Sequence, residues 1–73
     1  MNQKILNVFQ AINHRTIQAR KYETTKEIYR NMNFAALQTL YALDIIDYSQ
    51  YNNLYHKVYL LESITTKDID NLL

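Results

Sequence analysis

Glycine and proline are both absent from this chain of 73 residues, and their absence limits the folds that it can adopt. Tight β-hairpins need residues that tolerate positive φ, and phosphate-binding loops need glycine where the backbone approaches the ligand. Flexible and semi-rigid linkers are usually rich in one of the two residues. The sequence therefore predicts an all-α protein, a compact bundle with short connections that forms one domain over residues 1–73.

Apolar residues recur at helical spacing through most of the chain, and they predict three main helices and a short C-terminal one. The predicted ranges are about 2–21, 25–43, 48–62 and 66–72. In the first range the apolar face is broad and amphipathic, which is typical of a helix that covers a core. Its members are Ile5, Val8, Phe9, Ile12, Thr16 and Ala19.

Three of these helices begin with the pattern of a capping box, in which two side chains bind free backbone amides of the first turn. The paired residues are Thr24 with Glu27, Asp47 with Gln50, and Thr65 with Asp68. Apolar residues flank the last two pairs at the positions of a hydrophobic staple: Ile46 with Tyr51, and Ile64 with Ile69. The end of segment 25–43 is predicted at Asp44, because aspartate tolerates left-handed backbone geometry better than the β-branched residues that follow.

Segment 25–43 is apolar on two sides. The side predicted to face the core consists of Ile28, Met32, Ala35, Ala36, Thr39, Leu40 and Leu43. The second line consists of Phe34, Leu37 and Tyr41. A helix of this kind either lies between two neighbours in its own bundle or contacts another chain. We interpret the second line as core and keep its three residues as secondary candidates for an interface.

Four of the seven tyrosines fall within twelve residues of the third predicted helix. They are Tyr48, Tyr51, Tyr55 and Tyr59, and their spacing places them within about 80° of the helix circumference. Tyrosine offers a large contact area, few rotatable bonds and a hydroxyl group that tolerates water. We predict that this stripe binds a partner; the alternative is that it only shields the core. Tyr48 and Tyr59 lie farthest from the apolar arc and are predicted to be the most exposed.

A domain of this size buries only about 60–65% of the surface that its unfolded chain exposes, so its stability often depends on additional support. The chain has no cysteine, and its two histidines, His14 and His56, lie far apart in the sequence. A disulfide is therefore excluded, and a closed zinc site is not expected. Self-association, most simply as a homodimer, or binding to a larger protein remains as the expected source of support.

The net charge of +1 predicts no strong general affinity for nucleic acid, although the two halves of the chain differ. Residues 1–33 carry +4 and residues 34–73 carry −3. The cationic side chains near the first connection are Arg15, Arg20, Lys21, Lys26 and Arg30. They point in different directions on a helical wheel, which favours a solvated surface. The alternative is a helix-turn-helix protein in which these residues contact phosphates and segment 47–62 reads bases.

Catalysis is not predicted, because neither histidine has a carboxylate or a nucleophile at a telling spacing. We expect no enzyme activity, no cofactor, no metal and no small-molecule substrate. No apolar run approaches the about 20 residues that cross a bilayer, and residues 1–10 lack the pattern of a secretory signal. We therefore expect a cytoplasmic protein without a membrane partner.

These observations favour a small protein-interaction module with a regulatory or inhibitory role. It is expected to dock its tyrosine-rich face on a partner protein or on a second copy of itself. A nucleic-acid-binding regulator and a structural assembly subunit are the alternatives.

Overall fold

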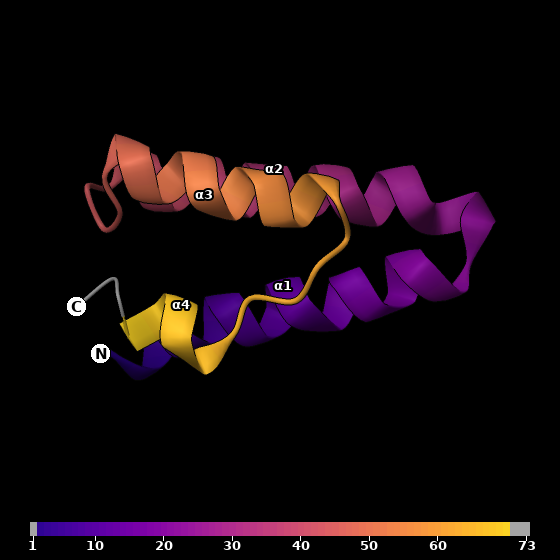
Figure 1. The fold of residues 1–73 in the computed structure, drawn as a ribbon, viewed down its shortest axis with the longest axis horizontal. Helices are drawn as coiled ribbons and strands as arrows, with labels where there is room; N and C mark the ends of the chain where they lie inside the picture. The colour runs from indigo at the N-terminus through magenta and orange to yellow at the C-terminus, as the bar shows by residue number, and fades with distance from the viewer. Residues whose placement is uncertain (1, 71–73) are drawn as a thin grey trace.

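The computed structural model describes residues 2–70, which form helices and no strand (Figure 1). The elements are α1 (Gln3–Lys21), the 3-10 turn η1 (Glu23–Thr25), α2 (Lys26–Ala42), α3 (Tyr48–Tyr59) and α4 (Thr66–Asp70). The predicted all-α fold of three main helices and a short final one is confirmed. The end of the last predicted helix, at residues 71–72, lies outside the described residues.

The core lies between the three long helices. Figure 1 shows α2 and α3 along one side of the molecule and α1 along the other, with α4 returning to the N-terminal half of α1. The connections before α3 and after it each add one buried isoleucine, so the loops close the core at both ends. The buried cluster consists of Phe9, Ile12, Leu37, Leu40, Ile46, Leu54, Val58 and Ile64.

Two of the three predicted capping boxes are present. Gln50 N donates to Asp47 Oδ1 (2.8 Å), and Asp47 N donates to Gln50 Oε1 (2.7 Å). Asp68 N donates to Thr65 Oγ1 (3.2 Å), and Thr65 N donates to Asp68 Oδ2 (2.9 Å).

The box predicted for Thr24 and Glu27 is wrong, because Thr24 lies inside η1. Thr25 precedes α2 instead and makes no side-chain cap, while Glu27 forms an ion pair with Arg30. The tight turn η1 places the start of α2 one residue later than the predicted cap requires.

Both α2 and α3 end in a Schellman motif whose left-handed residue is not glycine. At α2 the left-handed residue is Asp44 (φ 58°), and Ile45 N donates to the Leu40 carbonyl oxygen (3.0 Å). This confirms the stop predicted at Asp44. The predicted end of the third helix at residue 62 is wrong: Leu61 has φ 58°, and α3 ends at Tyr59.

Polar contacts hold the segment after α3 against α1 and α3. Asn13 Nδ2 donates to the Ile64 carbonyl oxygen (2.8 Å), and Ile64 N donates to Asn13 Oδ1 (2.7 Å). Lys57 forms an ion pair with Asp68. Burial by itself raises the pKa of Asp68, but the hydrogen bonds from Lys57 and Thr65 outweigh burial and hold the pKa below its ordinary value.

The side of α2 that faces the core is only partly the one predicted. The buried residues of α2 are Asn33, Leu37 and Leu40, of which Leu40 belongs to the predicted core side and Leu37 to the second line. The buried side is therefore turned by about 100° from the centre of the predicted one. Ile28 and Leu43 remain 61% and 64% exposed, and Met32, Ala35 and Thr39 are exposed as well. The two sides differ because Asn33, a polar residue that apolar periodicity does not include, is buried against α1.

The side chain of Asn33 is fully buried and has partners for both its carbonyl and its amino group. Its Nδ2 donates to the Ile12 carbonyl oxygen and to Thr16 Oγ1 (3.2 Å each). Its Oδ1 accepts a hydrogen bond from Arg15 Nε (2.7 Å). A buried amide is costly unless it is paired, so these partners hold α2 at one rotation about its axis.

We expect Asn33→Ala to lower the free energy of unfolding by about 1–3 kcal/mol, because Arg15 and Thr16 lose a buried partner. Asn31→Ala, at an exposed position of the same helix, is the matched control, since it brings the same gain in helix propensity. Urea denaturation of both variants and the parent measures the difference. Equal stability of the two variants would contradict the role assigned to the buried amide.

Asp44→Gly is expected to leave stability unchanged or to raise it by up to about 1 kcal/mol. Asp44 has positive φ, a conformation that glycine adopts without the steric cost of a Cβ atom. Thermal unfolding of the variant and the parent measures this change. A loss greater than about 1 kcal/mol would show that the carboxylate itself has a role in the turn.

Candidate functional site

Pairs of side chains link α2 and α3 along the whole length of α3. The Arg30 guanidinium lies 5.5 Å from the centre of the Tyr59 ring, the Phe34 and Tyr55 rings stack at 4.4 Å, and the Tyr41 and Tyr48 rings meet edge to face at 6.2 Å. From one pair to the next, the residue number rises along α2 by as much as it falls along α3. The two helices therefore form an antiparallel hairpin with nearly parallel axes.

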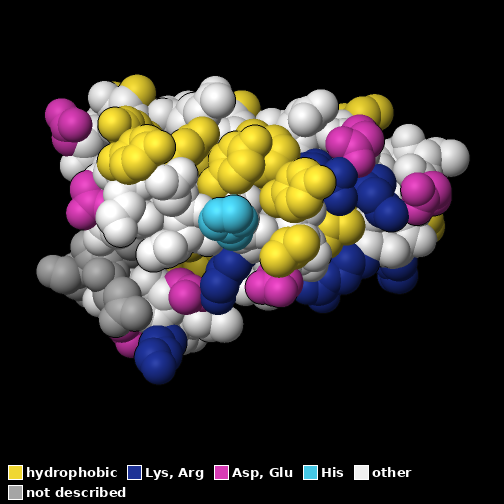
Figure 2. Space-filling view, turned by 45° about the horizontal axis from the view of Figure 1, so that its top comes forward, with side chains coloured by type: hydrophobic (Ala, Val, Ile, Leu, Met, Phe, Trp, Pro, Cys, Tyr) yellow, Lys and Arg dark blue, Asp and Glu magenta, His cyan; other side chains and the backbone are white. Residues whose placement is uncertain are grey.

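Five rings on this hairpin form one connected cluster. Tyr51 joins the pairs, because its ring lies 5.3 Å from that of Tyr41 and 5.9 Å from that of Tyr55. We call this cluster the aromatic surface; its members are Phe34, Tyr41, Tyr48, Tyr51 and Tyr55. Figure 2 shows hydrophobic side chains gathered in a band along this side of the molecule. Stacked and edge-to-face contacts are each worth about 0.5–1.5 kcal/mol beyond burial, so the rings hold one another in place.

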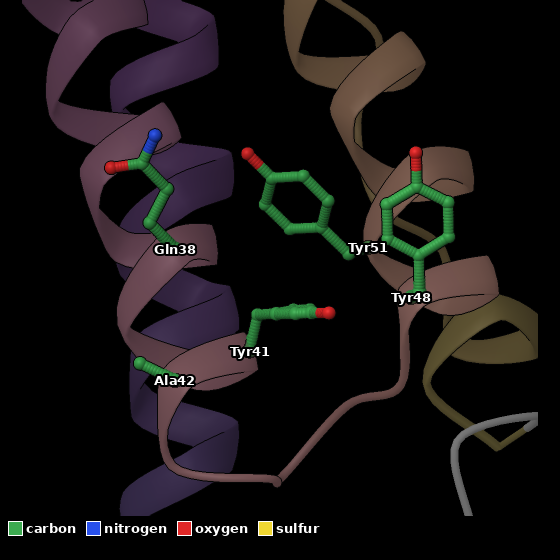
Figure 3. A pocket seen from close by; sticks show the side chains of 5 residues that line it. All are labelled: Gln38, Tyr41, Ala42, Tyr48 and Tyr51. Atoms are coloured by element: carbon green, nitrogen blue, oxygen red, sulfur yellow. The ribbon is translucent and has the colours of Figure 1, made fainter.

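A pocket of about 440 Å³ opens at the end of the aromatic surface that is nearest to the connection between α2 and α3. Figure 3 shows the rings of Tyr41, Tyr48 and Tyr51 around it, with the amide of Gln38 above. Ala42 completes the lining, and none of the five residues is charged. The pocket therefore offers apolar ring surfaces together with hydroxyl and amide groups that can form hydrogen bonds.

The predicted order of exposure along the tyrosine stripe is confirmed. Tyr48 and Tyr59 are 64% and 57% exposed, Tyr55 is 38% exposed, and Tyr51 is half-buried against the core. The stripe does not act as one unit, however. Tyr59 packs with Arg30, whereas the other three tyrosines belong to the aromatic surface.

The secondary line on α2 divides between the core and the surface. Leu37 is fully buried, as expected of a core residue, so it is no candidate for contact with a partner. Phe34 is half-buried under Tyr55, and Tyr41 is exposed in the pocket. Tyr41 lies in a different helix from the tyrosine stripe and was predicted as part of the second line on α2, and the pocket residues Gln38 and Ala42 were not predicted as site residues. If the segments of α2 and α3 had been paired antiparallel, Tyr41 would have been predicted beside Tyr48 and Tyr51.

The five cationic candidates do not form a shared site. Arg15 binds Asn33, and Arg20 Nε donates to the Leu61 carbonyl oxygen. Lys26 forms an ion pair with Glu23 at 2.7 Å. The hydrogen bond from Lys26 and its positive charge both lower the pKa of the Glu23 carboxyl group. Arg30 pairs with Glu27. Lys21 lies 6.0 Å from the Tyr22 ring.

The nearly parallel axes of α2 and α3 also differ from the crossing angle of about 90–120° in a helix-turn-helix. The arrangement therefore gives little support to the nucleic-acid alternative.

No family model, curated protein or solved structure matches this chain. Among the described residues, no three side chains of histidine, aspartate or glutamate gather as a metal ion would require. None of the helices in residues 2–70 has the length and apolar character needed to span a membrane. The surface chemistry of the hairpin is accordingly the basis for a functional proposal.

We expect Tyr51→Ser to lower the free energy of unfolding by about 1–3 kcal/mol, because its half-buried ring touches two others and packs on the core. Tyr48→Ser is the control, and its cost should be about 0.5–1 kcal/mol, since that ring is mostly exposed and contacts one other ring. Thermal melts followed by circular dichroism measure both. An equal loss in the two variants would mean that the stripe contributes to stability as one unit.

Proposed function

We propose that this chain is a protein-interaction module that binds a partner protein on its aromatic surface and thereby acts as a regulator or an inhibitor. Its role is binding, not catalysis. The observation that carries the proposal is the connected cluster of five rings, with the uncharged pocket at its end.

The aromatic surface has the composition of an interface centre. Aromatic residues are enriched there, and charged residues are depleted. Because the rings already contact one another, binding would require little further ordering of side chains, and this lowers the entropic cost of association. Along α2 the surface covers the seven residue steps from Phe34 to Tyr41, or about 10 Å of helix.

Charge indicates how the partner would be oriented. The pocket lining carries no charge, but Asp44 and Asp47 lie in the loop between Ala42 and Tyr48, two of the lining residues. Asp44 is exposed, and Asp47 uses one carboxylate oxygen for its cap. We therefore propose that the partner presents an apolar segment along the rings and a lysine or arginine at the pocket end.

Replacing Tyr41 and Tyr48 by serine should weaken partner binding at least tenfold while leaving helicity largely intact, because both rings are exposed members of the aromatic surface and line its pocket. Aromatic residues that a partner buries can contribute about 2 kcal/mol or more. The partner is first captured from a lysate of the source cells, then purified and titrated by isothermal calorimetry. Ile17→Ser, an exposed apolar position on α1, is the control and should bind like the parent.

If the double variant binds the purified partner as tightly as the parent does, the aromatic surface is only a cover for the core. Sedimentation of the same variant tests whether the chain forms a homodimer through the aromatic surface. A dimer of that kind in the parent would dissociate in the double variant.

A further inference from the structure

A second apolar surface lies on the opposite side of α2. It consists of the residues that the sequence assigned to the core and the structure leaves exposed. We call it the outer stripe; its members are Ile28, Met32, Ala35, Thr39 and Leu43. Around the α2 axis it lies about 150° from Phe34 and Tyr41, at about 100° per residue, so it is separate from the aromatic surface.

We infer that the outer stripe binds the same stripe of a second copy of this chain, with the two α2 helices antiparallel. The order of side-chain sizes supports this occupant. Ala35 lies at the middle, with Met32 and Thr39 at nearly equal distances on either side and Ile28 and Leu43 at the two ends. In an antiparallel pair related by a two-fold axis near Ala35, Ile28 meets Leu43 of the partner copy, and Met32 meets Thr39.

This pairing also satisfies the packing rules for helices. The small residue at the centre lets the two axes approach closely, and the larger residues beside it fill the space where the helices diverge. A two-fold interface uses the same surface on both copies. The outer stripe meets that requirement, because it has a small residue at its centre and a large apolar residue at each end.

Charge is the second argument for a second copy. From Asn31 to Leu43 there is no charged residue, so self-pairing brings no like charges together along this length. Burying the stripe would remove from water Ile28 and Leu43, which are 61% and 64% exposed.

The expected dimer is weak. The stripe extends over sixteen residues, from Ile28 to Leu43, or about 22 Å along one helix. A single helix pair buries less than the about 1,200–2,000 Å² of a stable, specific interface. We therefore expect a dissociation constant between about 10 μM and about 1 mM. The dimer leaves both aromatic surfaces free and facing away from each other, so it would present two partner-binding surfaces.

Sedimentation equilibrium of the full chain tests this pairing with charged substitutions at the two ends of the stripe. Ile28→Lys and Leu43→Glu should each weaken dimerisation at least tenfold, because each places a charge against an apolar side chain. The double variant should recover to within about threefold of the parent, since opposite charges then meet twice across the two-fold axis. Tyr48→Ser combined with Tyr59→Ser is the control and should dimerise like the parent.

Cross-linking provides a second measurement if a charged variant does not fold. The chain has no cysteine, so Ala35→Cys introduces a single thiol at the proposed two-fold axis. Its disulfide-linked dimer should form at least tenfold faster than that of Asn53→Cys, an exposed position on α3.

The inference is overturned if the parent remains monomeric at about 1 mM. It is also overturned if the double charge variant is weaker than both single variants, if the tyrosine variant abolishes association, or if both thiols cross-link at the same rate.

Discussion

The buried amide of Asn33 is the interaction on which both surfaces of this protein depend. It binds Ile12 and Thr16 of α1 and accepts a hydrogen bond from Arg15. Turning α2 by one residue would place Met32 or Phe34 at this point and leave the polar groups of α1 without their partner. Since an unpaired buried polar group costs about 1–3 kcal/mol, the rotation of α2 is fixed.

Fixing α2 decides what each of its sides can do. Leu37 and Leu40 fill the core, and Phe34 and Tyr41 turn towards α3, where they meet the tyrosines. The outer stripe is left without a neighbour among the described residues. A three-helix arrangement covers only part of its central helix, so a helix with more than one apolar side leaves some of its apolar residues exposed.

The connections show how a chain without glycine ends its helices. Asp44 and Leu61 both adopt left-handed geometry at the same position of the same motif. Left-handed geometry costs a residue with a Cβ atom about 1–2 kcal/mol, and buried contacts offset this cost. Ile46 and Ile64, which follow the two turns, are both core residues. Their burial stabilises turns that the local sequence disfavours.

The sequence by itself determined the helices, because apolar periodicity and capping pairs act within a few residues of one another. Asp47 with Gln50 gave the start of α3, and Asp44 gave the end of α2. The tyrosine stripe and its more exposed members could also be read from spacing alone. Local signals of this kind do not need the rest of the molecule.

Only the tertiary structure decided which side of α2 faces inwards. Helical spacing offers two apolar lines, but the buried side takes Leu40 from one and Leu37 from the other. Its rotation depends on the polar contact of Asn33 with α1, which is distant in the sequence. The aromatic surface has the same origin, since Phe34 and Tyr41 reach the tyrosines only through the antiparallel pairing of α2 with α3. The end of α3 at Tyr59 was likewise set by the turn at Leu61 and not by helix propensity. Contacts between distant segments therefore turned locally predictable helices into a molecule with two distinct surfaces.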